Sequence, residues 1–213
     1  MSQRVILLAG GSGKVGRSLV GHFLNKGDTV AFTATSEQSL NEVYAEYSSE
    51  KDRLFGFVQD FTLQGFATEL VSQLGEKGIQ PDGLVNNARS MAFLKIDTDG
   101  TVSRHNFMNE YLMDVVAPYE LTMAMADGPE SRLKRVVNIG SQYGAVAANP
   151  ALYVDHAQQS PIHYGVAKAA LAHLTKELAV RLVDRDIQVN CMAFGGVEGR
   201  VDDEFKQRYG KLA

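Results

Sequence analysis

Two residues four positions apart, Tyr164 and Lys168, have side chains suited to proton transfer. Residues 161–183 are predicted as a helix with Pro161 in its first turn, which places the two side chains one turn apart on the same face. There the ammonium favours the phenolate form of the tyrosine. Upstream, Ser141 ends an apolar run that reads as a buried strand. A hydroxyl, a phenol and an amine together can exchange protons with a carbonyl/alcohol pair.

The Tyr-x-x-x-Lys spacing arises often by chance, so the rest of the chain must support it. The apolar run at residues 4–9 predicts a strand buried on both faces. A glycine-rich loop follows it and opens a predicted helix that runs to about Lys26, before a second strand at residues 29–33. In this context the glycines permit a tight turn and let the backbone approach a pyrophosphate at a helix N-terminus. The residues predicted to bind a dinucleotide here are Gly10, Gly11, Ser12, Gly13, Lys14, Val15 and Gly16.

The end of the second predicted strand bears on which nicotinamide cofactor binds. An acid at this position would hydrogen-bond to the ribose 2′-hydroxyl and select NAD. The chain instead has Thr35 and Ser36, with no acid before Glu37. Small hydroxyl side chains, with Lys14 nearby, could accept a 2′-phosphate, so we expect NADP(H) in preference to NAD(H). The alternative is that Lys14 is simply solvated.

Strands and helices alternate along the whole chain. Further strands are predicted at residues 54–59, 84–85, 135–139 and 187–193, and further helices at residues 39–49, 64–76, 101–125 and 205–209. Residues 144–160 form an irregular insertion, and Pro118 should kink the long helix. The alternation predicts an α/β fold: a single Rossmann-type doubly wound parallel sheet of about six strands, with helices on both faces, in one domain spanning residues 1–213.

Polar and glycine residues follow the predicted strands. In parallel sheets ligands bind beyond the carboxyl ends of the strands. We therefore expect one shared site along one edge of the sheet, formed by the glycine loop, Thr35, Asp60, Asn87, Ser141 and Gly195.

Bulk properties exclude several classes of function. The 213 residues carry a net charge of −4 with acids and bases mixed, which does not indicate a nucleic-acid surface. The single cysteine, Cys191, permits no disulfide within the chain and fits a reducing compartment. No apolar run reaches about 18 residues, and the five histidines are scattered without metal-ligand spacing. We expect a cytoplasmic protein without a metal site, a nucleic-acid partner or a membrane span.

The chain resembles the short-chain dehydrogenases/reductases over nearly its whole length. The resemblance is carried by the glycine loop, Asp60, Asn86-Asn87-Ala88, Asn138-Ile139-Gly140-Ser141, Tyr164-x-x-x-Lys168 and Val189-Asn190. It implies that Tyr164 donates or accepts the proton, that Ser141 binds the substrate oxygen, and that Lys168 holds the nicotinamide ribose and tunes the tyrosine.

The resemblance also implies cofactor contacts outside the glycine loop. Asp60 and the adjacent Phe61 would meet the adenine, Asn87 and Ala88 would lie near the cofactor, and Val197 would follow the nicotinamide. Residues 33–37 are similar to the matching stretch of NADPH-dependent 3-oxoacyl-carrier-protein reductases, which supports the phosphate interpretation at Thr35. Members of the family are usually dimers or tetramers, so a homodimer or homotetramer acting on a small-molecule carbonyl or alcohol is expected.

The chain departs from the family pattern at several positions. Lys14 and Arg89 stand where glycine is common, and Asp114 stands where the fourth catalytic residue, an asparagine, is expected. Asp114 could hold a water as that asparagine is thought to do, but its charge would pull on Lys168. Ala9 and Phe194 also replace the usual threonine and proline.

Two larger departures concern whole segments. The interval between Ser141 and Tyr164 is about ten residues longer than usual. With such an insertion, and with the residues that follow it, the chain is similar to reductases found with nucleotide-sugar and nonulosonic-acid pathways. The sequence stops where the family's lid helix and seventh strand would begin, so a C-terminally short form without the seventh strand is expected. Its uncovered sheet edge would favour association.

Two functions remain open from the sequence. The first is an NAD(P)(H)-dependent oxidoreductase that transfers a hydride between nicotinamide and a carbonyl/alcohol substrate, with Tyr164 as general acid/base. The second is a non-catalytic NADP(H)-binding sensor or scaffold on the same fold, suggested by Lys14, Arg89, Asp114 and the missing C-terminal part. An epimerase or dehydratase on this fold is a further alternative.

Overall fold

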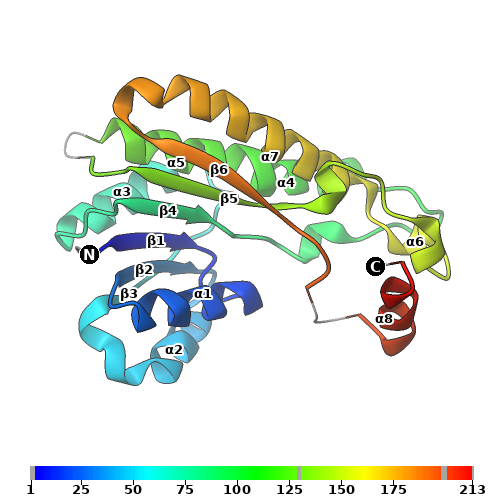
Figure 1. Ribbon diagram of the computed structural model, residues 1–213, viewed down its shortest axis with the longest axis horizontal. Coiled ribbons are helices and arrows are strands. Elements are labelled where there is room, and N and C mark those ends of the chain that lie inside the picture. Colours follow the sequence, from blue (N-terminus) through cyan, green and yellow to red (C-terminus); the bar gives the residue numbers. More distant parts are fainter. Residues whose placement is uncertain (1–2, 129–130, 198–200, 213) are drawn as a thin grey trace.

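The computed structural model describes residues 3–128, 131–197 and 201–212 and contains one six-stranded sheet, in the order β3-β2-β1-β4-β5-β6, with every pairing parallel (Figure 1). The strands are β1 (Val5–Ala9), β2 (Thr29–Ala34), β3 (Leu54–Val58), β4 (Gly83–Asn86), β5 (Arg135–Ser141) and β6 (Gln188–Phe194). The strand order reverses between β1 and β4, which is the point where such sheets place their ligand crevice. The predicted doubly wound parallel sheet is confirmed.

Eight α-helices connect and flank these strands in the described part of the chain. They are α1 (Lys14–Asn25), α2 (Glu37–Glu46), α3 (Phe66–Glu76), α4 (Arg104–Tyr111), α5 (Ala117–Asp127), α6 (His156–Gln159), α7 (Ile162–Arg181) and α8 (Asp203–Gly210). Helix α2 begins two residues before the predicted position because the Ser36 side chain accepts a hydrogen bond from the Ser39 backbone N–H.

The predicted long helix around Pro118 is present, but its irregularity lies one turn earlier than that proline. Residues Leu112–Val116 form a π-helical turn, η3, between α4 and α5. The Ala117 N–H donates to the Leu112 carbonyl, five residues back, and Pro118 that follows has no N–H to continue the α-helical pattern. Such widened turns occur often at functional sites, and this one carries Asp114.

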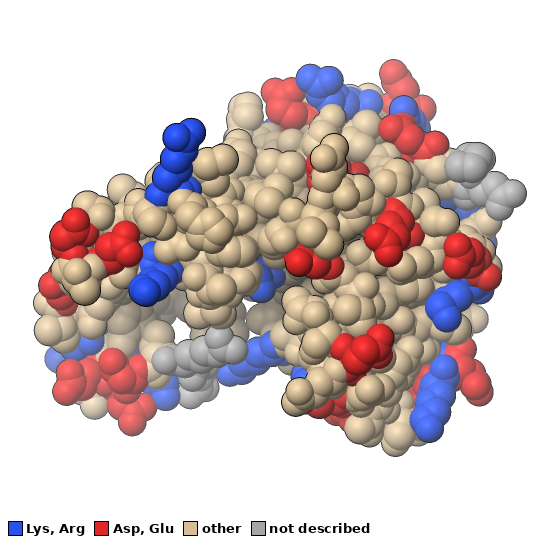
Figure 2. All heavy atoms as spheres, turned by 180° about the vertical axis from the view of Figure 1, so that it is seen from behind, with Lys and Arg blue, Asp and Glu red and all other residues tan. Residues whose placement is uncertain are grey.

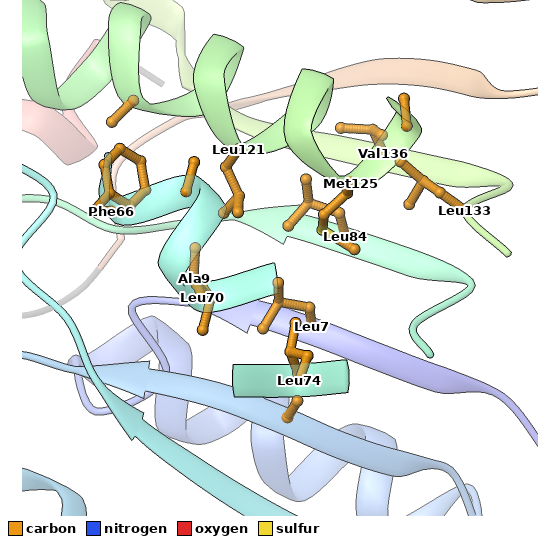
Figure 3. Packing of buried hydrophobic residues seen from close by; sticks show 14 of the residues in the cluster. Leu7, Ala9, Phe66, Leu70, Leu74, Leu84, Leu121, Met125, Leu133 and Val136 are labelled. Atoms are coloured by element: carbon orange, nitrogen blue, oxygen red, sulfur yellow. The ribbon is translucent and has the colours of Figure 1, made fainter. Parts of the chain in front are cut away.

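The helices cover the sheet through two apolar clusters. On one face, Leu7, Ala9 and Leu84 of the strands pack against α3, represented by Leu70 and Leu74, and α5 lies beside it, as Figure 3 shows. On the other face, α1 and α2 pack over β1, β2 and β3 around Phe32, which is fully buried. Strands β5 and β6 carry half-buried or exposed side chains on this second face, and β6 is an edge strand.

The insertion after β5 is less irregular than predicted. It contains the 3₁₀ turns η4 (Gln142–Gly144) and η5 (Pro150–Leu152) and helix α6, and α8 packs against it (Figure 1). The Tyr153 and Phe205 rings lie 5.5 Å apart, and Arg208 Nε donates to the Leu152 carbonyl at 2.8 Å. This part of the molecule therefore stands beyond the carboxyl ends of β5 and β6.

Two expectations concern absences. Within the described residues, no helix is both long enough and apolar enough to cross a membrane. The same residues contain no group of three or more histidine, cysteine or acidic side chains that could hold a metal ion.

Candidate active site

A cavity of about 680 Å³ lies at the carboxyl ends of β1, β2, β3 and β4. Figure 2 shows the molecule hollowed between the part that carries α1 and α2 and the part that carries α6 and α8, with acidic and basic side chains interspersed on this face. Most of the predicted cofactor residues line the cavity: Gly10, Ser12, Gly13, Lys14, Val15, Thr35, Asp60, Phe61, Asn87 and Ala88.

The glycine loop is shaped by close backbone contacts. Gly10 has a φ of +79°, and a Cβ on it would lie 2.6 Å from the Ala88 Cα atom. A Cβ on Gly16 would lie 2.2 Å from the Gly10 carbonyl oxygen, and one on Gly11 would lie 2.6 Å from the Phe32 Cβ atom. Gly11 and Gly16 therefore hold the loop against helix and strand, while the other loop residues face the cavity.

Helix α1 points its N-terminus at the cavity. Gly13 is its N-cap residue and makes no side-chain cap, so backbone N–H groups of the first turn are not satisfied by a side chain. Gly13, Lys14 and Val15 all line the cavity. Unsatisfied N–H groups and the helix dipole favour an anion at this position.

Polar contacts tie the neighbouring strand ends to this loop. The Thr33 hydroxyl accepts a hydrogen bond from the Gly10 N–H at 2.8 Å, and Asn87 Nδ2 donates to the Gly10 carbonyl at 2.9 Å. One oxygen of Asp60 accepts from both the N–H and the hydroxyl of Thr62. Among the described residues that line the cavity, Asp60 is the one acidic residue, and Lys14 and Arg89 are the basic residues.

Lys168 reaches the end of β5, which carries Ser141, and its ammonium lies near the ring of Tyr164. Lys168 Nζ donates to the Ile139 carbonyl at 3.0 Å, two residues before Ser141, whose Oγ accepts from the Tyr143 N–H at 3.2 Å. Tyr164 lies in the first turn of α7, half-buried, with the Lys168 ammonium 5.7 Å from the centre of its ring.

Two glycines allow η4 to approach α7 at this point. A Cβ on Gly144 would lie 2.7 Å from the Lys168 carbonyl oxygen, and one on Gly165 would lie 3.2 Å from the Tyr143 carbonyl oxygen. The turn that follows Ser141 is thus pressed against the helix that carries Tyr164 and Lys168.

Asp114 forms an ion pair with Lys168. Its Oδ1 accepts from the ammonium at 2.9 Å, and the side chains of Asp114 and Lys168 are 1% and 7% exposed. Burial raises the pKa of Asp114, while the charge and hydrogen bond of Lys168 act in the opposite direction. The widened turn η3 therefore places the Asp114 carboxylate in direct contact with the Lys168 ammonium. The sequence had left open whether Asp114 holds a water in place of the family's asparagine.

A second buried acid, Glu110, lies one turn before Asp114. It is fully buried, and neither of its carboxyl oxygens has a hydrogen-bond partner in the described part of the chain. Burial, followed by the nearby charge of Asp114, raises its pKa from 4.5 to about 7. The Oδ2 atom of Asp114, in η3, and the Nδ1 atom of His163, in α7, are likewise buried and have no hydrogen-bond partner among the described residues.

Sequence reasoning missed Glu110 and gave Arg89 no role. The signal for Glu110 was its spacing of four residues from Asp114, which puts both carboxyls on one helix face. The Arg89 guanidinium carbon lies 4.6 Å from the centre of the Tyr164 ring. Val197, in contrast, lies beyond β6 and is 55% exposed. It lines neither the cavity at the glycine loop nor a second cavity, of about 610 Å³, which Tyr164 lines together with residues of the insertion.

Known proteins resemble this chain over nearly its whole length. A curated 3-oxoacyl-[acyl-carrier-protein] reductase of Haemophilus influenzae is 28% identical, covering 92% of this chain and 74% of its own. The rhamnolipids biosynthesis 3-oxoacyl-[acyl-carrier-protein] reductase of Pseudomonas aeruginosa is 27% identical over 94% of this chain and 75% of its own. The post-translational flagellin modification protein A of Campylobacter coli is 23% identical over 99% and 84%.

Solved structures share the fold. A short chain dehydrogenase from Leptospira borgpetersenii with bound NAD⁺ superposes with a TM-score of 0.80 at 24% identity, covering 98% of this chain and 77% of that one. The NADP complex of RhlG from Pseudomonas aeruginosa superposes with a TM-score of 0.78 at 24% identity, covering 94% and 75%. The sequence model of the short chain dehydrogenase family matches residues 4–210 of this chain. This chain belongs to the short chain dehydrogenase family of oxidoreductases.

Proposed function

We propose that the protein binds a nicotinamide dinucleotide in the cavity at the α1 N-terminus and catalyses hydride transfer to or from a small-molecule carbonyl/alcohol pair. The observation that carries the proposal is that the Lys168 ammonium donates to the Ile139 carbonyl near the carboxyl end of β5 with the Tyr164 ring beside it, while Arg89, which lines the cavity, lies against that same ring. When bound, the cofactor supplies the hydride or takes it up. The residues of the chain bind, orient and exchange the proton.

The cavity fits such a cofactor. The glycine loop and the first turn of α1 would hold the pyrophosphate, because the N–H groups of that turn have no side-chain cap and the helix dipole points there. Asp60, Phe61, Asn87 and Ala88 line the remaining wall, where the adenosine part would lie.

Tyr164 acts as the general acid/base in this proposal. Its phenol donates a proton to the carbonyl oxygen as a hydride reaches the carbonyl carbon, or accepts the proton from the alcohol in the reverse direction. Ser141 would donate a hydrogen bond to the same oxygen, and Lys168 would hold the nicotinamide ribose. Lys168 is held in position for this task by its ion pair with Asp114 and by its hydrogen bond to the Ile139 carbonyl.

We also propose NADP(H) as the preferred cofactor. Thr35 lines the cavity at the end of β2, no acid lies before Glu37, and Lys14 lines the same cavity. The known structures with NAD⁺ and with NADP both resemble this chain, so a direct test is needed.

Thermal stabilisation by the two nucleotides supplies that test. NADP should bind at least about tenfold more tightly than NAD, a difference of about 1.4 kcal/mol. Equal stabilisation by both would refute the preference, and no stabilisation by either would refute the proposed function.

We further propose that the protein is a homodimer or homotetramer and acts in the cytoplasm. The outer faces of α4, α5 and α7 expose large apolar side chains, namely Met108, Tyr111, Tyr119, Val166 and Val180. Covering them against a second copy would remove this apolar surface from water. Light scattering in solution tests the oligomeric state, and a monomer at all concentrations would contradict it.

One observation favours the non-catalytic alternative. The Asp114–Lys168 ion pair neutralises the ammonium that would otherwise act on Tyr164. A sensor or scaffold would bind the nucleotide without turnover, and its binding would survive Tyr164→Phe. A panel of carbonyl substrates with NADPH distinguishes the two functions.

A further inference from the structure

The positive charge of Lys168 is paired with the carboxylate of Asp114. Its ammonium donates to Asp114 at 2.9 Å and to the Ile139 carbonyl at 3.0 Å, and the pair is nearly fully buried. An ion pair presents little net charge to a third group, so Lys168 alone favours a phenolate at Tyr164 less than an unpaired ammonium would.

A second cation contacts the same phenol ring. The Arg89 guanidinium carbon lies 4.6 Å from the centre of the Tyr164 ring, closer than the Lys168 nitrogen at 5.7 Å. None of the ion pairs between described residues involves Arg89, although its charge acts to lower the pKa of both Glu110 and Asp114. It is exposed and also lines the cavity at the α1 N-terminus, so it stands where that cavity meets Tyr164. A planar guanidinium stacks well on an aromatic face, and it stays charged at any working pH.

We propose that Arg89 is the positioning residue that restores the positive field at Tyr164, in compensation for the negative charge that Asp114 brings to Lys168. The two residues act with opposite sign on the same phenol. The buried acids and the two cations then leave one net positive charge facing Tyr164 when Glu110 carries a proton.

Other groups that face this cluster do not supply that charge. Glu110 on α4 is buried without a partner and opposes it when ionised. On α7, His163 donates from Nε2 to the Phe93 carbonyl at 2.7 Å. On η4, the Tyr143 hydroxyl lies 3.4 Å from that of Tyr153, and burial raises the pKa of Tyr143. Of the two cations that lie over the Tyr164 ring in the described part of the chain, Arg89 is therefore the one without an ion-paired carboxylate.

The inference rests on the proposed function only for the role of Tyr164 as acid/base. The test is a double-mutant cycle of Arg89→Met and Asp114→Asn, read by the near-ultraviolet absorbance of tyrosinate as a function of pH. Each protein is compared with its own Tyr164→Phe counterpart, so that the difference isolates Tyr164 from the seven other tyrosines among the eight of the chain. This titration needs no substrate.

Arg89→Met should move the Tyr164 absorbance rise to higher pH by about half a unit, or about threefold in the phenol/phenolate ratio, the size expected for an exposed cation on an aromatic ring. Asp114→Asn should move it to lower pH, and the double variant should return close to the wild type. Arg89→Lys, which keeps the charge, should lie nearer the wild type than Arg89→Met. Arg181→Met, at the far end of α7, is the matched control and should change nothing.

Three results with Arg89→Met would overturn the inference. The first is an unchanged titration of Tyr164, and the second is a shift in the same direction as that of Asp114→Asn. The third is a loss of NADPH affinity without any change in the titration, which would assign the guanidinium to the cofactor phosphates. With a turned-over substrate, the pH profile of kcat/KM should show the same displacements. Should turnover be absent while the titrations shift as described, the proposed function fails and the charge compensation stands.

Discussion

Glu110→Gln should remove a pH-dependent loss of stability from the protein. Glu110 is fully buried and its pKa is raised from 4.5 to about 7, first by burial and then by the charge of Asp114. Between these two values the folded protein binds more protons than the unfolded chain. The stability that the protonated carboxyl contributes is therefore complete below about pH 4.5 and is lost as the pH rises through about 7.

The size of the effect follows from the two pKa values. At about 1.4 kcal/mol per pH unit, the interval from 4.5 to about 7 corresponds to a loss of about 3 kcal/mol. Glutamine has nearly the same shape and cannot ionise, so the variant should lack this loss. The repulsion between the two carboxyls is already included in this interval, because the charge of Asp114 is one of the causes of the raised pKa.

Urea unfolding followed by circular dichroism measures the difference. From about pH 4 to about pH 9, the free energy of unfolding of the wild type should fall relative to that of Glu110→Gln by up to about 3 kcal/mol. Glu76→Gln, at the exposed end of α3, is the control and should follow the wild type. Parallel curves for the wild type and Glu110→Gln would show that Glu110 is not held as a neutral acid, and would refute the reasoning.

Three further predictions test the cofactor site and its frame. Thr35→Asp should reverse the cofactor preference toward NAD, because a carboxylate repels a 2′-phosphate and bonds to a 2′-hydroxyl; isothermal titration with both nucleotides measures it, and unchanged NADP affinity would contradict it. Gly16→Ala should weaken nucleotide binding by tenfold or more, since its Cβ would lie 2.2 Å from the Gly10 carbonyl oxygen. Gly27→Ala is the control for general instability, because its φ of +83° strains an alanine although the Cβ would meet nothing within 4 Å. Equal nucleotide affinity in the two variants would count against the loop geometry. Asn138→Ala should destabilise the fold by about 2 kcal/mol, because the fully buried amide accepts a hydrogen bond from Asn86 at 2.8 Å and donates one to Thr175 at 2.9 Å, and both would be lost. A change below about 1 kcal/mol in urea unfolding would show that water replaces the amide.

The fold could be predicted from the sequence because local and global signals agree. Continuous apolar runs such as Val5–Ala9 predict strands buried on both faces, and the glycine loop, the helix and the next strand follow in the order that a parallel sheet requires. The position of Gly10, Thr35, Asp60 and Asn87 in the cavity followed from the same rule, because each comes just after a strand.

Details that depend on tertiary contacts were not predictable. The π-helical turn arises where Pro118 interrupts the hydrogen bonding of a helix already packed against the sheet, and the sequence pointed to a kink at the proline instead. The turns in the insertion exist because Tyr153 and Leu152 find partners on α8, more than 50 residues later in the chain. Glu110 looks like an ordinary helix-surface acid until α7 covers it.

The most direct test of the account is the rate of hydride transfer from NADPH to a carbonyl substrate, compared between the wild type and Tyr164→Phe. The phenylalanine keeps the ring under Arg89 and beside Lys168 but removes the proton. A general acid/base of this kind contributes about 100-fold to 10,000-fold, so the variant should lose at least about 100-fold in rate while its NADPH affinity stays within a few fold. Equal rates in the two proteins would contradict the central claim that Tyr164 moves the proton.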